Sequence, residues 1–400
     1  MHKYLKTYAK GHIMNIRKTV AIALLSAVCF IGFSIPASAE PLYYEESIPE
    51  INVSAGAAIL IEANTGTVLY AKNEKEHRSI ASTTKIMTAL LTLEAGELDS
   101  PFTVDSTAIL VEGTSMGLRE GDIVTRRALC YGMLLPSGND AANAAAINVS
   151  GSYSAFAEKM NNKAKALSME NSNFVTPSGL DADGQYSCAY DLAVLTAYAL
   201  KNEDFREICS QENAKVSFGN PPYDRWLSNS NKLLSSYPDC IGVKTGFTDN
   251  ARRTLVSAAT RDGVTLIAVT LNAPDDWQDH TKMLDYGFEK VKCHSTGYDT
   301  DSLTLPIICS DKDTVKLSSK EVMLPLTEEQ RDDVKAIVHL PKFIYSDITA
   351  GETVGKIEYI LNGRTVATAD IVAGENCNEK PQEVDIFTVI YRFIRKILCI

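Results

Sequence analysis

Hydrophobic residues at two distant places in the chain follow the patterns of β-strands. Residues 57–61 and 68–70 are apolar runs on either side of an Asn-Thr-Gly turn signal, which predicts a hairpin. Residues 253–260 and 264–272 are apolar, β-branched runs joined by an Asp-Gly turn signal, which predicts another. We expect one sheet to bring these strands together.

Between and after these strands, hydrophobic residues recur at the spacing of helices that bury one face. The expected helices cover residues 82–94, 124–135, 141–149, 156–169 and 278–291. Strands at both ends with helices between them predict an α+β domain over residues 45–295, built on an antiparallel sheet.

The C-terminal quarter of the chain has a different pattern. Short β-like stretches become frequent, such as 357–360 and 365–371 on either side of an Asn-Gly turn signal. They predict a small all-β, sandwich-like domain over residues 301–375.

Residues 384–400 are apolar, with Arg392, Arg395 and Lys396 on one face if the segment is helical. A helix of that length spans roughly 25 Å, which is less than the ~30 Å of a hydrocarbon core. We therefore expect an amphipathic helix that anchors the protein by lying in the membrane interface. Packing of this helix against the β domain is the alternative.

The first 39 residues have the pattern of a signal peptide. Arg17 and Lys18 precede an apolar run over 20–33, and Ala37-Ser38-Ala39 forms a small-residue cleavage site. The run is too short for a membrane-spanning helix, which needs about 20 apolar residues. We expect export and cleavage after Ala39.

Composition excludes several classes of function. The formal net charge is −11, and the body of the chain has no basic cluster, so a nucleic-acid partner is not expected. The nine cysteines include no Cys-x-x-Cys pair, which argues against a zinc site. Export permits disulfides, but the sequence does not specify any.

Three short motifs carry the candidate chemistry: Ser82-Thr83-Thr84-Lys85, Ser137-Gly138-Asn139 and Lys244-Thr245-Gly246. Alone, each has an ordinary structural explanation, as a helix N-cap, a turn and a strand end. Together and in this order they resemble the set Ser-x-x-Lys, Ser-Asp-Asn and Lys-Thr-Gly of β-lactamases and penicillin-binding proteins.

The first two motifs can supply a nucleophile and its proton transfers. Ser82 needs a base to remove its proton, and Lys85 lies one helical turn away, on the same face. Lys85 acts as a base only if its pKa falls, which burial and the charge of Lys244 would cause. Ser137 can relay a proton to the leaving amine, and Asn139 can orient the lysine or the substrate amide.

The third motif can bind the substrate. Lys244 and Thr245 can hold a carboxylate through charge and a hydrogen bond, and Gly246 lets the strand lie close to the ligand. The backbone N–H groups of Ser82 and Phe247 can form an oxyanion hole.

These residues resemble the low-molecular-mass penicillin-binding proteins that are serine-type D-alanyl-D-alanine carboxypeptidases. The resemblance covers nearly the whole mature chain, including the blocks at 57–94, 114–116, 135–141, 173–174, 177–181, 231–234 and 242–248. It implies a penicillin-binding/β-lactamase-like catalytic domain, followed by the all-β domain and the anchor helix. It also implies an acyl-enzyme on Ser82, with no metal ion and no cofactor.

The implied partners follow from the same family. They are peptidoglycan pentapeptides ending in D-Ala-D-Ala, which lose the terminal D-alanine, and β-lactams as covalent inhibitors. The implied location is the outer face of the cytoplasmic membrane.

Some positions depart from the family pattern. Ala251 stands where glycine is expected before Arg252-Arg253, and the arginine that some members place near the substrate carboxylate is missing. Lys244 and Thr245 are then left as the carboxylate clamp. His280 is interpreted as an exposed helix residue.

Three other functions use similar residues. A class A β-lactamase needs a deacylating glutamate in a Glu-x-x-Leu-Asn context, which Glu158 and Glu170 lack. A DD-transpeptidase differs only in resolving the acyl-enzyme with an amine instead of water. A non-catalytic binder of wall peptides or β-lactams would not need the intact Ser82, Lys85 and Lys244.

Overall fold

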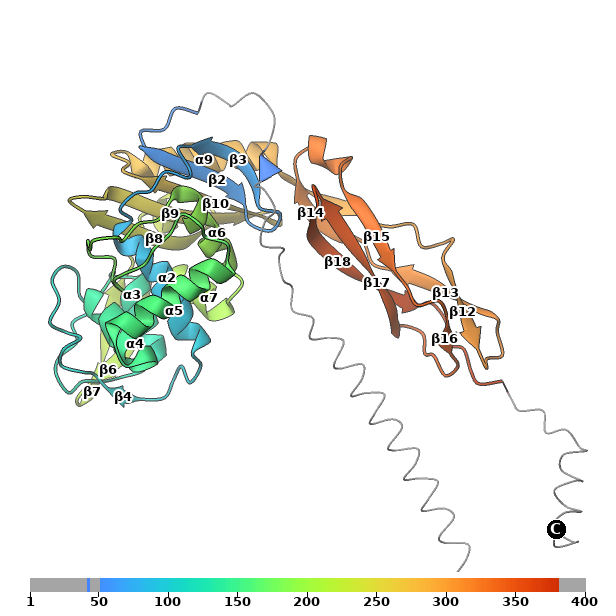
Figure 1. The fold of residues 1–400 in the computed structure, drawn as a ribbon, viewed down its shortest axis with the longest axis horizontal. Helices are drawn as coiled ribbons and strands as arrows, with labels where there is room; N and C mark the ends of the chain where they lie inside the picture. The colour runs from blue at the N-terminus through green and yellow to red at the C-terminus, as the bar shows by residue number, and fades with distance from the viewer. Residues whose placement is uncertain (1–41, 44–50, 381–400) are drawn as a thin grey trace, which may run out of the picture. The chain divides into compact units, whose positions relative to one another are not determined.

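The computed structural model describes residues 42–43 and 51–380 (Figure 1). The predicted signal peptide (1–39) and the predicted amphipathic helix (384–400) lie outside the described residues. No helix among those described is long and apolar enough to cross a membrane.

The central sheet has six strands in the order β1-β3-β2-β10-β9-β8. They are β1 (Leu42–Tyr43), β2 (Ala57–Glu62), β3 (Thr67–Lys72), β8 (Cys240–Thr248), β9 (Arg252–Arg261) and β10 (Val264–Leu271). Strand β10 pairs antiparallel with both β9 and β2. The two predicted hairpins therefore meet in one sheet, as expected.

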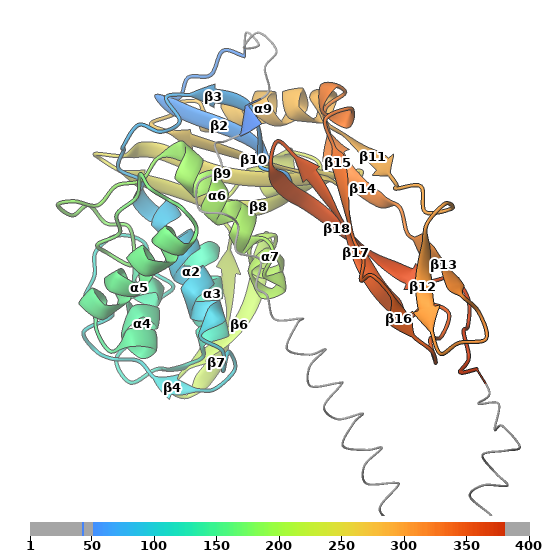
Figure 2. The same ribbon diagram turned by 45° about the vertical axis from the view of Figure 1, so that its right-hand side comes forward.

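Side chains that alternate along these strands enter two separate cores. Ile59 and Ile267 point into the core made with the helices in the middle of the chain. Leu60 and Leu266 point into the core made with α9 (Asp276–Lys290). Figure 2 shows α9 on one side of the sheet and the helices on the other.

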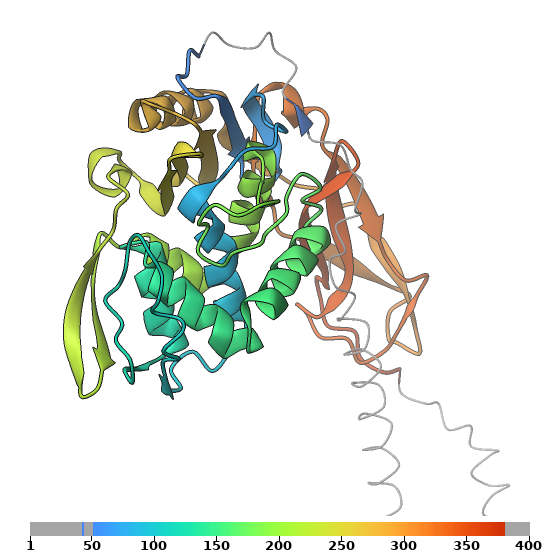
Figure 3. The ribbon, with the colours of Figure 1, turned by 60° about the vertical axis from the view of Figure 1, so that its left-hand side comes forward.

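The helical region lies between β3 and β8 in sequence. Its elements are the 3-10 helix η1 (Ala81–Thr84), α2 (Lys85–Glu94), α3 (Arg126–Leu134), α4 (Asn139–Ser150), α5 (Tyr153–Ala166), α6 (Ala189–Ala199), α7 (Glu203–Cys209) and α8 (Leu233–Ser236). The same region also contains a four-stranded sheet. Its strands, in order, are β4 (Phe102–Thr103), β5 (Ile123–Val124), β6 (Asn213–Gly219) and β7 (Pro222–Ser228). The sequence did not predict the β6–β7 hairpin, which is seen at the left edge of Figure 3.

The C-terminal part is all-β, and the α+β fold class is confirmed. Its strands are β11 (Lys292–Thr296), β12 (Thr304–Ile308), β13 (Thr314–Ser319), β14 (Val322–Leu326), β15 (Lys335–His339), β16 (Ile344–Tyr345), β17 (Thr353–Leu361) and β18 (Arg364–Ala373), with the short 3-10 helix η2 (Glu329–Arg331) between β14 and β15. They surround a core that includes Val315, Ile357 and Ile371. Strand β11 pairs with β14, so this sheet structure begins before residue 301.

His280 is not exposed, so its interpretation from the sequence was wrong. It is 0% exposed on α9, one and two turns from the buried Met283, Leu284 and Gly287, and it therefore belongs to the buried face of the helix. Its ring nitrogens contact the hydroxyls of Ser257 and Thr270. Burial lowers the pKa of His280 to about 3, so the ring is neutral.

Candidate active site

Ser82 lies in a turn whose backbone is unusually constrained. It is the second residue of η1, and Ala81 before it has a positive φ of +46°, a conformation that is uncommon for residues other than glycine. Gly179 passes so close to the carbonyl of Ala81 that a Cβ at position 179 would collide with it. Such local strain often marks a functional site.

Lys85 begins α2 and points directly at Ser82. Its Nζ lies 2.8 Å from Ser82 Oγ, 2.7 Å from Asn139 Oδ1 and 2.7 Å from the carbonyl oxygen of Ser178. The side chain is 0% exposed. Three hydrogen-bond partners therefore fix the amine against the hydroxyl of Ser82.

The surroundings of Lys85 favour its uncharged form. Burial lowers its pKa well below the ordinary value, and the positive charge of Lys244 lowers it further, against the opposing charge of Asp140. An uncharged amine has a free lone pair, so Lys85 can accept the proton of Ser82.

The second motif forms the turn into α4. Ser137 has a φ of +67°, and Asn139 is the first residue of the helix. The backbone N–H of Asn139 donates to the carbonyl of Thr114 at 2.7 Å, and its Nδ2 donates to the carbonyl of Glu112 at 2.7 Å. These bonds direct Oδ1 of the amide towards Lys85.

Asp140 fixes the loop that follows Glu112. Its carboxylate accepts hydrogen bonds from the backbone N–H groups of Met116, Gly117 and Leu118, at 2.9, 3.1 and 3.0 Å. The carboxylate lies in the first turn of α4, where the helix dipole favours a negative charge. These bonds hold the backbone of residues 116–118 against the start of α4.

The third motif lies on the edge strand β8. Lys244 is 1% exposed, and its Nζ donates to the carbonyl of Thr245 at 2.9 Å. Burial lowers the pKa of Lys244 to about 7. A Cβ on Gly246 would lie 3.1 Å from the backbone nitrogen of Ser82, so glycine allows β8 to lie beside the nucleophile.

Two contacts of the site were not found from the sequence. The carbonyl of Ser178 accepts from Lys85, and the hydroxyl of Ser230 lies 2.6 Å from that of Thr245. A backbone carbonyl has no signature in sequence, whereas Ser230 directly precedes the block at 231–234 and could have been considered with it. One hydroxyl of the pair donates to the other, so one hydroxyl hydrogen stays free to donate to a ligand.

The predicted residues differ in how closely the structure joins them. Direct hydrogen bonds join Ser82, Lys85 and Asn139, while no hydrogen bond among the described residues joins the hydroxyl of Ser137 to this group. The side chain of Phe247 is 61% exposed, so only its backbone follows Gly246 into the site. The arrangement places the hydroxyl of Ser82 against the buried amine of Lys85, beside a strand that carries the buried Lys244.

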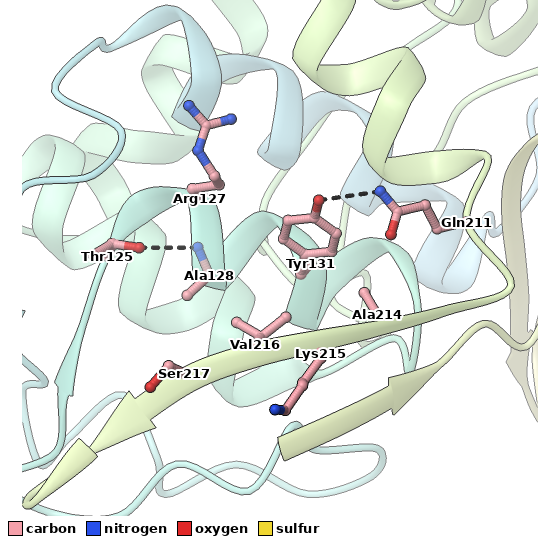
Figure 4. Close-up of a pocket in the computed structure, with 9 residues that line it drawn as sticks. All are labelled: Thr125, Arg127, Ala128, Tyr131, Gln211, Ala214, Lys215, Val216 and Ser217. Carbon is pink, nitrogen blue, oxygen red and sulfur yellow. Dashed lines mark hydrogen bonds between the residues drawn. The ribbon is translucent and has the colours of Figure 1, made fainter. Parts of the chain in front are cut away.

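A hollow of about 260 Å³ lies elsewhere, between α3 and β6 (Figure 4). Its lining includes Thr125, Arg127, Tyr131, Gln211 and Lys215, and none of them belongs to the three motifs. Residues 51–380 contain no group of three or more acidic, histidine or cysteine side chains placed to hold a metal ion.

Two family models match the chain. The D-alanyl-D-alanine carboxypeptidase family matches residues 44–275. The family described as the C-terminal domain of penicillin-binding protein 5 matches residues 288–379.

Curated relatives match over most of their length. The chain is 33% identical over 344 residues to D-alanyl-D-alanine carboxypeptidase DacF of Bacillus subtilis, covering 82% of this chain and 87% of the relative. It is 31% identical over 380 residues to D-alanyl-D-alanine carboxypeptidase DacA of Escherichia coli K12, covering 90% and 93%.

Solved structures have the same fold. The Streptomyces K15 DD-transpeptidase matches with a TM-score of 0.58 and 34% identity, covering 61% of this chain and 100% of that one. Penicillin-binding protein 5 from Haemophilus influenzae matches with a TM-score of 0.62 and 27% identity, covering 83% and 100%.

Proposed function

Because the chain belongs to the D-alanyl-D-alanine carboxypeptidase family of low-molecular-mass penicillin-binding proteins, we propose that Ser82 is its nucleophile and Lys85 its general base. The protein is a serine-type D-Ala-D-Ala carboxypeptidase of the cell wall. Its substrate class is peptidoglycan peptide ending in D-Ala-D-Ala, and β-lactams bind to it.

Acylation begins at the peptide bond between the two D-alanines. Ser82 Oγ attacks the carbonyl carbon while its proton passes to the uncharged Nζ of Lys85. The backbone N–H groups of Ser82 and Phe247 hold the negative oxygen of the tetrahedral intermediate. The contact of 2.8 Å between Lys85 Nζ and Ser82 Oγ is the observation that carries this proposal.

Release of the products completes the cycle. The C–N bond breaks as Ser137 relays the proton held by Lys85 to the departing amine of D-alanine, which leaves an ester on Ser82 and an uncharged Lys85. Water attacks this ester, gives a proton to Lys85, and releases the shortened peptide as that proton returns to Ser82 Oγ. Asn139 holds Lys85 in place during both steps, since its amide oxygen accepts from Nζ.

The third motif accounts for cleavage at a free C-terminus. The carboxylate of the terminal D-alanine binds the charge of Lys244 and the hydroxyl of Thr245, which Ser230 orients. Charge-assisted hydrogen bonds of this kind are about twice as strong as neutral ones. A peptide with an amidated C-terminus should therefore be a poor substrate.

Release of D-alanine from a synthetic pentapeptide, with and without an added amine acceptor, tests the proposal. Hydrolysis in water alone is the expected result, and the Ser82→Ala variant should release none. Release that depends on the acceptor, with transfer of the peptide to it, would instead make the protein a transpeptidase. Binding without release would make it a non-catalytic binder.

Export and membrane attachment are a further part of the proposal. The sequence pattern of residues 1–39 supports export, and the apolar residues and basic face of 384–400 support attachment in the membrane interface. The enzyme would then work at the outer face of the cytoplasmic membrane, where its wall substrate lies.

A further inference from the structure

The β6–β7 hairpin displays a tryptophan to solvent. Trp226 is 70% exposed and lies opposite Lys215 in the pairing of the two strands. Polar side chains share this exposed face of the hairpin, namely Asn213, Ser217, Asp224 and Ser228. Lys215 and Asp224 form an ion pair at 2.6 Å, and Asn213 accepts a hydrogen bond from Ser228.

The other aromatic residues of the hairpin have partners within the fold. Phe218 is buried, and the guanidinium of Arg225 lies 4.0 Å from its ring and 4.3 Å from the ring of Tyr223. Burial of an aromatic ring is strongly favourable, so an indole this exposed at the centre of a strand contributes little to folding. Polar side chains surround it, and their hydrogen-bonding groups could serve a ligand that stacks on the indole.

The hairpin is continuous with the substrate site. Two residues after the end of β7 comes Ser230, whose hydroxyl lies 2.6 Å from that of Thr245. Trp226 precedes Ser230 by four residues, which corresponds to about 13 Å along an extended strand. Trp226 is therefore close in the chain to the residue that contacts Thr245.

We propose that Trp226 is a carbohydrate subsite that holds a sugar ring of the wall glycan while its stem peptide is cleaved. This inference rests on the proposed function, because it requires a substrate in which sugar and D-Ala-D-Ala are joined. Five residues of extended peptide span at most about 17 Å. This span exceeds the roughly 13 Å of extended strand between Trp226 and Ser230, so a sugar at the far end of the stem peptide can reach Trp226 when the other end is at Thr245.

The chemistry of the face fits a sugar. The flat indole stacks against the C–H face of a pyranose, as aromatic rings do with other apolar surfaces. The neighbouring hydroxyl, amide, carboxylate and ammonium groups can hydrogen-bond the hydroxyl and acetamido groups around the ring. Lys215 also lines the hollow in Figure 4, so this polar surface continues past the edge of β6.

Kinetics on two substrates test the subsite. Trp226→Ala should cleave a free pentapeptide as well as the wild type does, but its kcat/KM on the disaccharide-pentapeptide should fall about three- to tenfold, through KM. Trp226→Phe should retain part of the wild-type preference, in kcat/KM, for the disaccharide-pentapeptide over the free pentapeptide. The control is Tyr345→Ala, which removes an aromatic that is 64% exposed in the all-β part and should change neither rate. Equal rates of Trp226→Ala and wild type on the disaccharide-pentapeptide, or equal losses on both substrates, would overturn the subsite.

Fluorescence supplies a readout that does not depend on catalysis. The chain has two tryptophans, so a Trp277→Phe variant reports on Trp226 alone. Titration with the N-acetylated wall disaccharide, without peptide, should change its emission in a saturable way. An unchanged emission contradicts the subsite. If the wild type cleaves neither substrate, the proposed function fails, and this titration still decides whether the subsite exists.

Discussion

Two buried lysines with different partners divide the chemistry of the site. Lys85 is surrounded by a hydroxyl, an amide oxygen and a carbonyl oxygen, and no carboxylate of residues 51–380 forms an ion pair with it. Within the same residues, the ammonium of Lys244 hydrogen-bonds to its neighbour's carbonyl. Burial lowers the pKa of both, and the charge of Lys244 lowers that of Lys85 further. The lysine that loses its proton more readily can act as the base, while the other still binds an anion.

Replacing Lys244 by arginine should change the pH dependence of catalysis. The pKa of Lys244 is lowered to about 7, so the clamp is charged below that pH and loses its charge above it. In the wild type, kcat/KM for a free-acid peptide should fall up to about tenfold for each pH unit above about 7. An arginine keeps its charge over this range, so Lys244→Arg should lose this decline.

Lys201→Arg is the matched control, because this lysine is exposed and lies outside the site. It should keep the wild-type profile. If kcat/KM of Lys244→Arg falls above about pH 7 as it does in the wild type, a group other than Lys244 causes the fall.

Secondary-structure elements position these side chains, and the sequence predicted part of them. Five helices (α2 to α5 and α9) and the two hairpins of the central sheet were predictable because their apolar residues recur with clear periods, whereas α6, α7 and α8 were not predicted. The β6–β7 hairpin was missed because its exposed positions include Tyr223 and Trp226, which obscure the alternation. His280 was misjudged because its polarity was given more weight than its position on the buried face of α9.

The sequence predicted the motif residues of the site but not all the groups that support them. The motif residues could be named because their side chains carry the chemistry. The support from Ser178 could not, since it comes from a carbonyl oxygen that only the folded chain brings to Lys85.

The turn between β2 and β3 contains a buried carboxyl group. Oε2 of Glu62 accepts from the backbone N–H groups of Asn64 and Thr65, at 2.9 and 2.7 Å, while Oε1 is buried and has no hydrogen-bond partner among the residues that the structure describes. Burial raises the pKa of Glu62 from 4.5 to about 7, although the hydrogen bonds oppose this. The folded protein therefore binds a proton here that the unfolded chain releases above about pH 4.5.

This pKa predicts that stability falls with rising pH. The contribution of protonated Glu62 to the free energy of unfolding is fully present below about pH 4.5, and it is lost as pH rises through about 7. Glu62→Gln stays uncharged, so at about pH 8 it should be up to about 3 kcal/mol more stable than the wild type, with a much smaller difference at about pH 5. Urea unfolding at the two pH values measures this.

The exposed Glu120 offers the control for that measurement. Glu120→Gln should leave the pH dependence of unfolding unchanged. If Glu62→Gln shows the same difference from the wild type at both pH values, the carboxyl does not titrate in this range.

At the scale of the whole molecule, charge and hydrophobicity are unevenly distributed along the sequence. The protein has a net charge of −11, while residues 384–400 carry Arg392, Arg395 and Lys396 among apolar residues. We therefore expect an anionic membrane to attract this segment and to repel the remainder of the protein.

Truncation after Pro381 should abolish membrane binding without changing activity on small peptides. Cosedimentation with anionic liposomes should pellet the full-length protein and leave the truncated one in solution. Binding of the full-length protein should weaken as salt is added, because exposed charges are screened. Replacing the three basic residues by glutamine should weaken binding to anionic liposomes more than binding to neutral ones. Equal pelleting of full-length and truncated proteins would exclude the anchor.

The central claim is that Ser82 forms a covalent intermediate with Lys85 as its base, and mass spectrometry after incubation with a penicillin tests it most directly. The wild type should gain the mass of one penicillin, and digestion should place the adduct on the peptide that contains Ser82. Ser82→Ala should gain none, whereas Ser137→Ala should still be labelled, more slowly. An adduct on another residue, or full labelling of Ser82→Ala, would contradict the account.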